Sequence, residues 1–372
     1  MYNKLESLLE IIENIGAKRI FIVCGKSSFA LSGAEKILKE LLHDYIIEYY
    51  SDYTANPKLD DVKKGVKVFN EFNPDLVISV GGGSAIDMAK MINTVSIHSD
   101  LIPENLVKGK DKIDRKGKPF IAIPTTAGSG SEATHFAVVY IDKVKYSLAD
   151  DFLLPDYCIL DAQLTMSTPR YIAASSAVDA LSQSIESIWS IYSTEESIAF
   201  AKEAIRLIID NVENAVNLGT RESKQSILYA SHLAGKAINI TKTTACHAIS
   251  YPMTSYFGIS HGNAVAVTIP EFLVWNYYLS ELDIIDKRGI SFVKNSIMEV
   301  VKLFNCDSIE ATVKKIIELY QKIGIKTTLK DLGIISQQDI DLIKSNVNIQ
   351  RMNNNPRRVD GDSLSLILNK IK

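Results

Sequence analysis

The first part of the chain alternates short runs of β-branched and aromatic residues with stretches in which apolar residues recur every three or four positions. Each run predicts a strand, and each periodic stretch predicts a helix. The predicted strands are residues 19–24, 45–50, 76–80 and 120–124, and the predicted helices are residues 34–42, 59–72 and a helix that begins at Ala85. Alternation at this spacing is typical of a parallel sheet with helices on both faces.

The pattern changes near Pro169. Pro155 and Pro169 enclose a last short apolar segment, residues 158–160. From residue 171 to about 278, and again from 287 to 370, apolar residues recur at helical spacing and strand-like runs become rare. A chain of 372 residues also exceeds the roughly 150 residues of a typical domain. We therefore expect an α/β domain, residues 1–168, followed by an all-α domain, residues 169–372.

Glycines follow the third predicted strand directly. The sequence Gly81-Gly82-Gly83-Ser84 leads from this strand into a helix, and such a turn favours a nucleotide phosphate at the helix N-terminus. Its spacing matches neither GxGxxG nor the P-loop, so a plain structural turn stays an alternative. A polar tract follows the fourth strand, and ligands of parallel sheets bind at the carboxyl ends of strands. The residues predicted to bind a cofactor here are Gly82, Gly83, Ser84, Asp87, Thr125, Thr126 and Ser129.

Two histidines, His247 and His261, lie fourteen residues apart and about seventy residues after Asp179. One carboxylate and two imidazoles can bind a divalent metal and leave positions open for substrate. On helices, Asp179 shares a face with Gln183, and His247 shares one with Tyr251. Spacing alone also allows a helix-capping role for Asp179 and ordinary polar roles for the histidines. His261 lies in an apolar neighbourhood, where a buried imidazole needs a partner, and a metal is one such partner.

Composition excludes several classes of function. The chain is 46% hydrophobic and 23% charged, with a net charge of −3, so no strong field attracts nucleic acid or an anionic membrane. No apolar run reaches the roughly 18 residues that cross a bilayer, and the first residues are too polar for a signal peptide. The four cysteines are scattered, which predicts reduced, mostly buried thiols rather than disulfides. We expect a cytoplasmic protein.

Together, these motifs resemble those of the iron-containing, or group III, alcohol dehydrogenases, relatives of glycerol dehydrogenase and dehydroquinate synthase. The segments that carry the resemblance are Asn56-Pro57, residues 81–87, 123–132, 154–156 and 178–181, and the segments around His247 and His261. The resemblance implies a Rossmann-like N-terminal domain and a helical C-terminal domain, as in the dehydroquinate synthase-like fold. It also implies NAD(P), a divalent metal (Fe²⁺ or Zn²⁺) and a small aldehyde or alcohol as substrate. We further expect a homodimer.

Two departures from the family concern the metal site. Members usually have a histidine ligand at the position of Gln183, so only Asp179, His247 and His261 carry over as conventional ligands, and Gln183 is kept as a candidate fourth. Three ligands and a water would still form a Lewis acid. Members often carry a second histidine at the position of Tyr251. The Tyr251 phenol either relays a proton or is a packed aromatic side chain.

A third departure concerns the nucleotide. Many NAD-specific members end their first strand with an aspartate that repels a 2′-phosphate, whereas this chain has Gly25 followed by Lys26 and Ser27. Lys26 and Ser27 could donate hydrogen bonds to that phosphate. The sequence therefore favours NADP(H) over NAD(H), and Lys145 is also expected to bind the cofactor.

Residues 25–29, Gln183 and residues 351–357 look most like the branch that contains phosphonoacetaldehyde reductases. The expected reaction is the NAD(P)H-dependent reduction of a small, anionic aldehyde. Arg351, Arg357 and Arg358 lie in a segment too polar for a core, and are either a solvated loop or partners of the anion. Two alternatives stay open: a dehydroquinate synthase-like lyase, whose basic motifs the chain lacks, and a nucleotide-binding protein with a decayed metal site.

Overall fold

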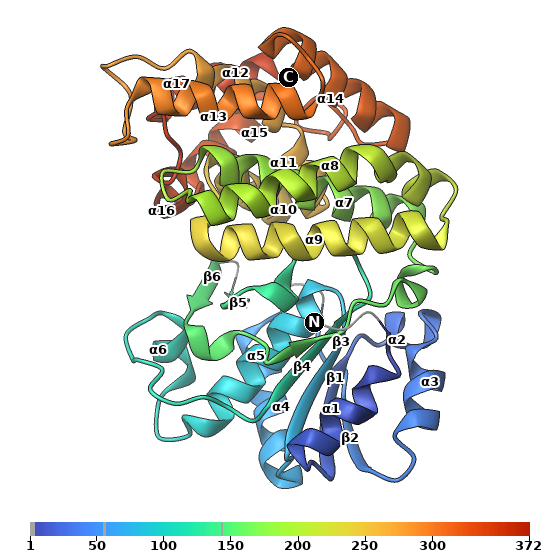
Figure 1. Cartoon of the computed structure of the whole chain (residues 1–372). Coiled ribbons are helices and arrows are strands. Elements are labelled where there is room, and N and C mark those ends of the chain that lie inside the picture. Colours follow the sequence, from blue (N-terminus) through green and yellow to red (C-terminus); the bar gives the residue numbers. More distant parts are fainter. Residues whose placement is uncertain (1–3, 55–56, 143) are drawn as a thin grey trace. The chain divides into compact units, whose positions relative to one another are not determined.

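The computed structural model describes residues 4–54, 57–142 and 144–372, so Asn56 lies outside the described residues. The chain divides into two compact units, Met1–Thr168 and Pro169–Lys372, called here the α/β unit and the helical unit. Figure 1 shows that the first unit contains the sheet and that the second is built of helices. The predicted fold class is thus confirmed.

Five parallel strands form the sheet of the α/β unit. In sheet order they are β2 (Ile46–Tyr50), β1 (Arg19–Cys24), β3 (Leu76–Gly81), β4 (Phe120–Pro124) and β7 (Tyr157–Cys158). Every residue of β3 and β4 is buried, as expected for strands covered on both faces. Strand order changes direction between β1 and β3, and ligands of such sheets bind at the carboxyl ends of strands at this point.

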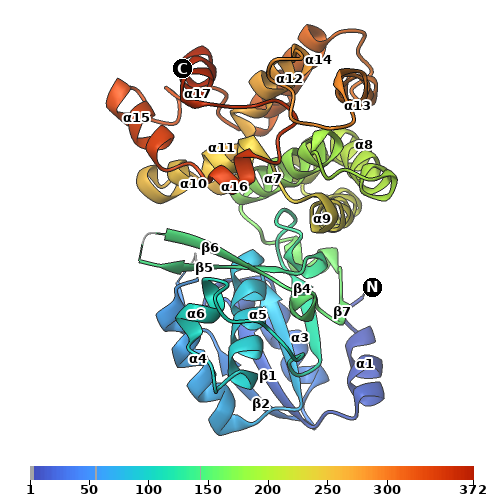
Figure 2. The ribbon, with the colours of Figure 1, turned by 90° about the vertical axis from the view of Figure 1, so that its left-hand side faces the viewer.

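Helices cover both faces of this sheet (Figure 2). Alternation along β1 sends Phe21 and Val23 to one face and Ile20 and Ile22 to the other. The helices on the first face are α4 (Leu59–Phe72) and α5 (Gly83–Ile97), and those on the second are α1 (Ser7–Ile15) and α3 (Ala34–Leu41). The unit also contains two short helices, α2 (Ser28–Leu31) and α6 (Pro103–Val107). The central strands β3 and β4 are thereby buried, whereas the edge strand β2 is partly exposed.

A hairpin that the sequence pattern does not predict follows β4. Its strands are β5 (Phe136–Ile141) and β6 (Val144–Ala149), paired antiparallel. The buried Lys90 of α5 donates hydrogen bonds to the carbonyl oxygens of Ser131, Thr134 and Phe136, each at 2.7 Å. Burial lowers the pKa of Lys90 to about 8, so the side chain is still a cation at neutral pH. Lys90 thereby connects α5 to the start of the hairpin.

The helical unit is organised around α7 (Arg170–Trp189), whose residues 177–189 are all buried. A helix that is buried all round forms the core of its unit. The other helices are α8 (Glu195–Asn217), α9 (Arg221–Thr241), α10 (Ala245–Phe257), α11 (His261–Ala266), α12 (Ile269–Tyr277), α13 (Ile290–Leu303), α14 (Ile309–Ile323), α15 (Gln337–Ser345), α16 (Ile349–Met352) and α17 (Gly361–Lys370). Helices α8, α9, α11 and α13 pack against α7. Polar groups on residues 177–189 of α7 therefore point into protein rather than solvent.

The segment after α16 corrects one expectation, because it is not too polar for a core. Asn354 and Asn355 are buried. Asn355 and Asn276 exchange amide hydrogen bonds at 2.8 and 3.1 Å, and Asn354 donates to the carbonyl oxygen of Thr243 at 2.8 Å. Burial of an amide is tolerated when its hydrogen bonds are made inside the protein.

The cysteines are free, as predicted: Cys24, Cys158 and Cys246 are buried and Cys306 is partly buried. Within residues 4–54, 57–142 and 144–372, no helix combines the length and the apolar character that crossing a membrane requires.

Candidate functional site

Three helices of the helical unit bring Asp179, His247 and His261 together. Nε2 of His247 lies 3.3 Å from Oδ1 of Asp179, and Nε2 of His261 lies 3.9 Å from the same oxygen. One ligand atom from each residue falls within 4.8 Å of the others. Two donors on one tetrahedral zinc ion lie about 3.4 Å apart, because each bond is about 2.1 Å long. The three side chains therefore fit a single small cation, and their mixed N and O donors suit zinc or ferrous iron.

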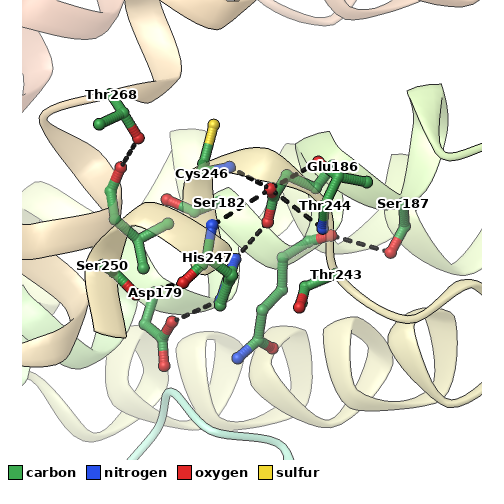
Figure 3. A network of polar contacts seen from close by, with 12 residues as sticks. Asp179, Ser182, Glu186, Ser187, Thr243, Thr244, Cys246, His247, Ser250 and Thr268 are labelled. Carbon is green, nitrogen blue, oxygen red and sulfur yellow. Dashed lines mark hydrogen bonds and ion pairs between the residues drawn. The ribbon is translucent and has the colours of Figure 1, made fainter. Parts of the chain in front are cut away.

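His247 is held between two carboxylates of α7 (Figure 3). Its Nε2 faces Asp179, and its Nδ1 is in close contact with Oε2 of Glu186, which is completely buried. Burial alone would lower the pKa of His247, but the charge of Glu186 and the hydrogen bonds to both carboxylates raise it to about 10. With the pKa raised, the His247 ring carries a proton on both nitrogens. A metal ion bound at Nε2 would take the place of the proton on that atom.

Ser250 orients the second histidine. Its hydroxyl donates to the carbonyl oxygen of His247 at 2.8 Å and lies 3.3 Å from Nδ1 of His261. Because that hydroxyl proton is already used, the oxygen accepts from Nδ1–H, which leaves the Nε2 lone pair of His261 on the side of Asp179. The His261 side chain is 35% exposed and that of His247 only 4%, so solvent meets the triad at His261.

Gly262 sets the position of His261. A Cβ at Gly262 would lie 1.8 Å from the carbonyl oxygen of Ser175 on α7. Only glycine allows the two backbones to approach so closely. The first residue of α11, His261, is thereby placed beside Asp179.

The two remaining predicted residues of this site lie beside the triad. Tyr251 follows His247 by one turn of α10, and its ring stacks on that of His261 with centroids 6.0 Å apart. Gln183 follows Asp179 by one turn of α7 and is buried. Each lies one helical turn from a residue of the triad, and the roles predicted for both from the sequence stay predictions.

The glycine turn lies at the carboxyl edge of the sheet. Strands β1 and β3 are neighbours there, so Gly25 and Gly81 leave the sheet side by side. A Cβ on Gly82 would come within 2.9 Å of Oγ1 of Thr126, and one on Gly83 within 2.8 Å of Oγ of Ser129. The turn therefore packs tightly against the tract after β4, and the 15-residue helix α5 begins at it. Amides at such a helix start attract phosphate.

Asp87 and Lys145 are also near this edge, but Asp87 has structural contacts. Its carboxylate accepts hydrogen bonds from the Ser131 hydroxyl at 2.5 Å and the Val138 amide at 3.0 Å. Burial raises the pKa of Asp87, while the charges of Lys90 and Lys145 oppose the rise. Lys145 lies on β6 and is partly buried. These contacts link α5 to the hairpin, and contact with a nucleotide stays a prediction for both residues.

Asp52, which pairs with Lys26, is a residue that the sequence analysis does not single out. Nζ of Lys26 lies 3.0 Å from Oδ1 of Asp52, which follows β2, and both side chains are exposed. The ion pair lowers the pKa of Asp52. A carboxylate after the second strand is a common partner for the adenosine ribose of NAD, so its position was a usable signal. Lys26 therefore has a competing anion next to it.

Comparison with known proteins identifies the family. The family model "Iron-containing alcohol dehydrogenase" matches residues 2–162, and "Fe-containing alcohol dehydrogenase family, C-terminal" matches residues 173–371. The chain belongs to the iron-containing alcohol dehydrogenase family. This alcohol dehydrogenase is 30% identical to long-chain-alcohol dehydrogenase 1 of Geobacillus thermodenitrificans, over 94% of this chain and 88% of that one. It is also 30% identical to NADPH-dependent butanol dehydrogenase of Clostridium saccharobutylicum, over 96% of this chain and 93% of that one.

A solved structure supports the same conclusion. Sulfoacetaldehyde reductase from Bifidobacterium kashiwanohense, in complex with NAD⁺, superposes with a TM-score of 0.88 at 27% identity, over 100% of this chain and 95% of that one. The predicted enzyme class is therefore confirmed: the protein is an NAD(P)-dependent oxidoreductase with a divalent metal site at Asp179, His247 and His261.

Proposed function

We propose that this alcohol dehydrogenase reduces a small, anionic aldehyde to the primary alcohol with NADPH. The observation that carries the reaction type is the convergence of Asp179, His247 and His261, with His261 partly exposed to incoming substrate. Membership of the oxidoreductase family favours this reaction over that of a lyase. An intact triad of ligands also speaks against a decayed metal site.

The chemistry divides between the bound groups and the side chains. When bound, a divalent ion polarises the carbonyl oxygen and the reduced nicotinamide supplies the hydride. Asp179, His247 and His261 would hold the ion and leave a position for substrate. Tyr251, stacked on His261, would give its phenolic proton to the alkoxide oxygen, with water as the alternative donor.

The proposed preference for NADP(H) depends on the edge of the sheet near Gly25. Gly25 has no carboxylate that would repel a 2′-phosphate, and Lys26 and Ser27 carry hydrogen-bond donors for that phosphate. Asp52 acts in the opposite sense, because it competes for Lys26. The relatives differ: the butanol dehydrogenase is named for NADPH, whereas the reductase structure contains NAD⁺. We assign the pyrophosphate to Gly82, Gly83 and Ser84, and the ends of the nucleotide to Thr125, Thr126 and Ser129.

The proposed anionic substrate is supported by the similarity to a reductase of sulfoacetaldehyde, a small aldehyde with a sulfonate group. We propose a phosphonate or sulfonate aldehyde. Arg357 forms an ion pair with Asp283 at 2.7 Å, and its guanidinium carbon lies 3.6 Å from the centre of the Trp275 ring. Both contacts give Arg357 a structural role. Arg351 lies on α16, which packs against α10, the helix of His247. Arg351 is therefore the proposed partner of the anion.

The test compares phosphonoacetaldehyde and sulfoacetaldehyde with butanal, a neutral aldehyde of similar size, using NADPH and NADH. We expect kcat/KM to favour the anions by at least about tenfold, the contribution of one charge-assisted pair. Arg351→Ala should remove that preference, whereas Arg358→Ala, at an exposed position after the buried asparagines, should keep it.

Other outcomes of this comparison would each contradict a specific part of the proposal. If butanal matches the anions in the wild-type enzyme, the anionic substrate is excluded. If the preference survives Arg351→Ala, the anion partner lies elsewhere. If NAD(P)H absorbance does not fall in proportion to any aldehyde, or turnover is unaffected by chelation, metal-dependent aldehyde reduction is contradicted.

A further inference from the structure

Glu186 is a completely buried carboxylate of α7 whose two oxygens contact different groups at the start of α10, backbone amides and a hydroxyl at one oxygen and the His247 ring at the other (Figure 3). Oε1 accepts hydrogen bonds at the start of α10, from the Thr244 amide at 3.2 Å, the Thr244 hydroxyl at 2.6 Å and the Cys246 amide at 3.0 Å. Oε2 faces Nδ1 of His247. The first oxygen thus caps a helix, and the second contacts a metal ligand.

We infer that Glu186 is a positioning residue for the metal, because it fixes the His247 ring with Nε2 toward the other two ligands. A neutral imidazole carries one proton, so a ring that donates Nδ1–H to a carboxylate must present its lone pair at Nε2. Nε2 is the atom that lies 3.3 Å from Asp179. Carboxylates in this position also make a histidine a stronger ligand.

The helix geometry explains how both sides of the ring are held. Asp179 and Glu186 are seven residues apart on α7, so they lie on the same face, two turns apart. The His247 ring contacts Asp179 through Nε2 and Glu186 through Nδ1. A rigid, buried helix therefore sets both the ligand atom and the orientation of the ring.

The burial of the Glu186 carboxylate beside His247 calls for a physical explanation. An unpaired buried carboxylate is strongly destabilising, and an apolar residue could fill the same space without that penalty. The cap at α10 needs only one acceptor oxygen, which a neutral side chain could supply. The second oxygen, directed at His247, is the part that the capping role leaves unexplained.

The experiment measures zinc affinity of the full-length protein by competition with a chromophoric chelator. In Glu186→Gln, the amide oxygen can still cap α10, but the amide nitrogen facing Nδ1 favours the ring with its proton on Nε2. We expect the dissociation constant for zinc to rise by about 10- to 100-fold, the usual effect of losing such a partner. The visible spectrum of the cobalt-substituted protein should change as well, because it reports ligand geometry.

Thr244→Val is the matched control. It removes a hydrogen bond to Oε1 and the acceptor of Trp189 Nε1, but leaves the contact of Oε2 with His247. The thermal midpoint should therefore fall at least as far as in Glu186→Gln, while zinc affinity stays within about twofold of wild type. Wild-type affinity in Glu186→Gln, or an equal loss of affinity in Thr244→Val, would overturn the inference.

A measurement on the wild-type protein applies even if Glu186→Gln does not fold. In ¹⁵N-histidine NMR spectra of the zinc-loaded protein, His247 should show a protonated Nδ1 and a metal-bound Nε2. Zinc on Nδ1 would contradict the inference. Both measurements omit aldehyde and nucleotide, so their outcome is separate from that of the proposed substrate.

Discussion

Gly262→Ala tests whether the contact between α11 and α7 determines the metal site. The added Cβ would lie 1.8 Å from the carbonyl oxygen of Ser175, whereas real contacts of this kind are not found below 3.0 Å. The oxygen belongs to the backbone of α7 and cannot rotate away as a side-chain atom could. The start of α11 must therefore move by roughly 1.2 Å, since packed interiors have no space to absorb the overlap.

The size of this shift can be compared with the site itself. Nε2 of His261, the residue before Gly262, is already 3.9 Å from Oδ1 of Asp179, against about 3.4 Å for two donors on one tetrahedral ion. A displacement of about 1 Å in a catalytic group costs on the order of 100-fold in rate, so kcat/KM should fall by about that factor. Overpacking should destabilise the protein by about 1–3 kcal/mol, which lowers Tm by roughly 2–12 °C.

The assay combines zinc affinity, kcat/KM for a reducible aldehyde, and Tm. Gly361→Ala is the matched control, because Gly361 also lies in the first turn of a helix, α17, and an added Cβ there meets no atom within 4 Å. Its Tm should be unchanged or slightly higher, since alanine lowers the entropy of the unfolded chain. If Gly262→Ala binds zinc and turns over like the wild type, the role given to this contact is wrong.

Three further predictions concern the two sites, and a fourth concerns stability. His261→Ala should abolish turnover but leave the Tm of the metal-free protein nearly unchanged, because the side chain is partly exposed; activity in the metal-loaded variant would contradict the ligand assignment. Gln183→His should tighten zinc binding, and an unchanged dissociation constant would show that position 183 does not face the metal. Gly25→Asp, made with Ser28→Ala to clear a 2.2 Å overlap, should reverse the preference for NADPH in kcat/KM. Lys90→Met should cost about 3 kcal/mol or more in urea unfolding, and a smaller loss would mean that its three carbonyl contacts matter little.

The fold follows from the sequence where each segment carries its own signal. Strands β3 and β4 are continuous apolar runs, and the structure buries all their residues. The segment of β5 is also rich in apolar residues, but it follows a polar tract and stands outside the regular alternation of strands and helices that predicts the sheet. Strand β6 is short, contains Lys145 and Ser147 among its apolar residues, and, within the described part of the chain, pairs only with β5. Such pairing is not visible in one segment.

The residues of the candidate metal site also divide into those that the sequence signals and those that depend on distant partners. Asp179, His247 and His261 could be predicted from residue type together with the resemblance to the family, whereas their spacing alone also allows ordinary polar roles. Glu186 was missed, since a single glutamate on a helix usually faces solvent, and its partners at the start of α10 are about 60 residues away in the sequence. Its spacing from Asp179 and Gln183, at helical repeat, was the available signal. Asn355 was misjudged for a related reason, because its partner Asn276 comes from another helix.

The metal ligands and the carboxylate behind them all belong to the helical unit, whereas the glycine turn belongs to the α/β unit. A ligand raises the stability of the body it binds through mass action, by about 2.7 kcal/mol at one hundred times its dissociation constant. Metal ions should therefore protect residues 169–372 from heat and proteases, and nucleotides should protect residues 1–168. In a cell short of metal, the helical half would be the part first exposed to degradation, even while the nucleotide is abundant.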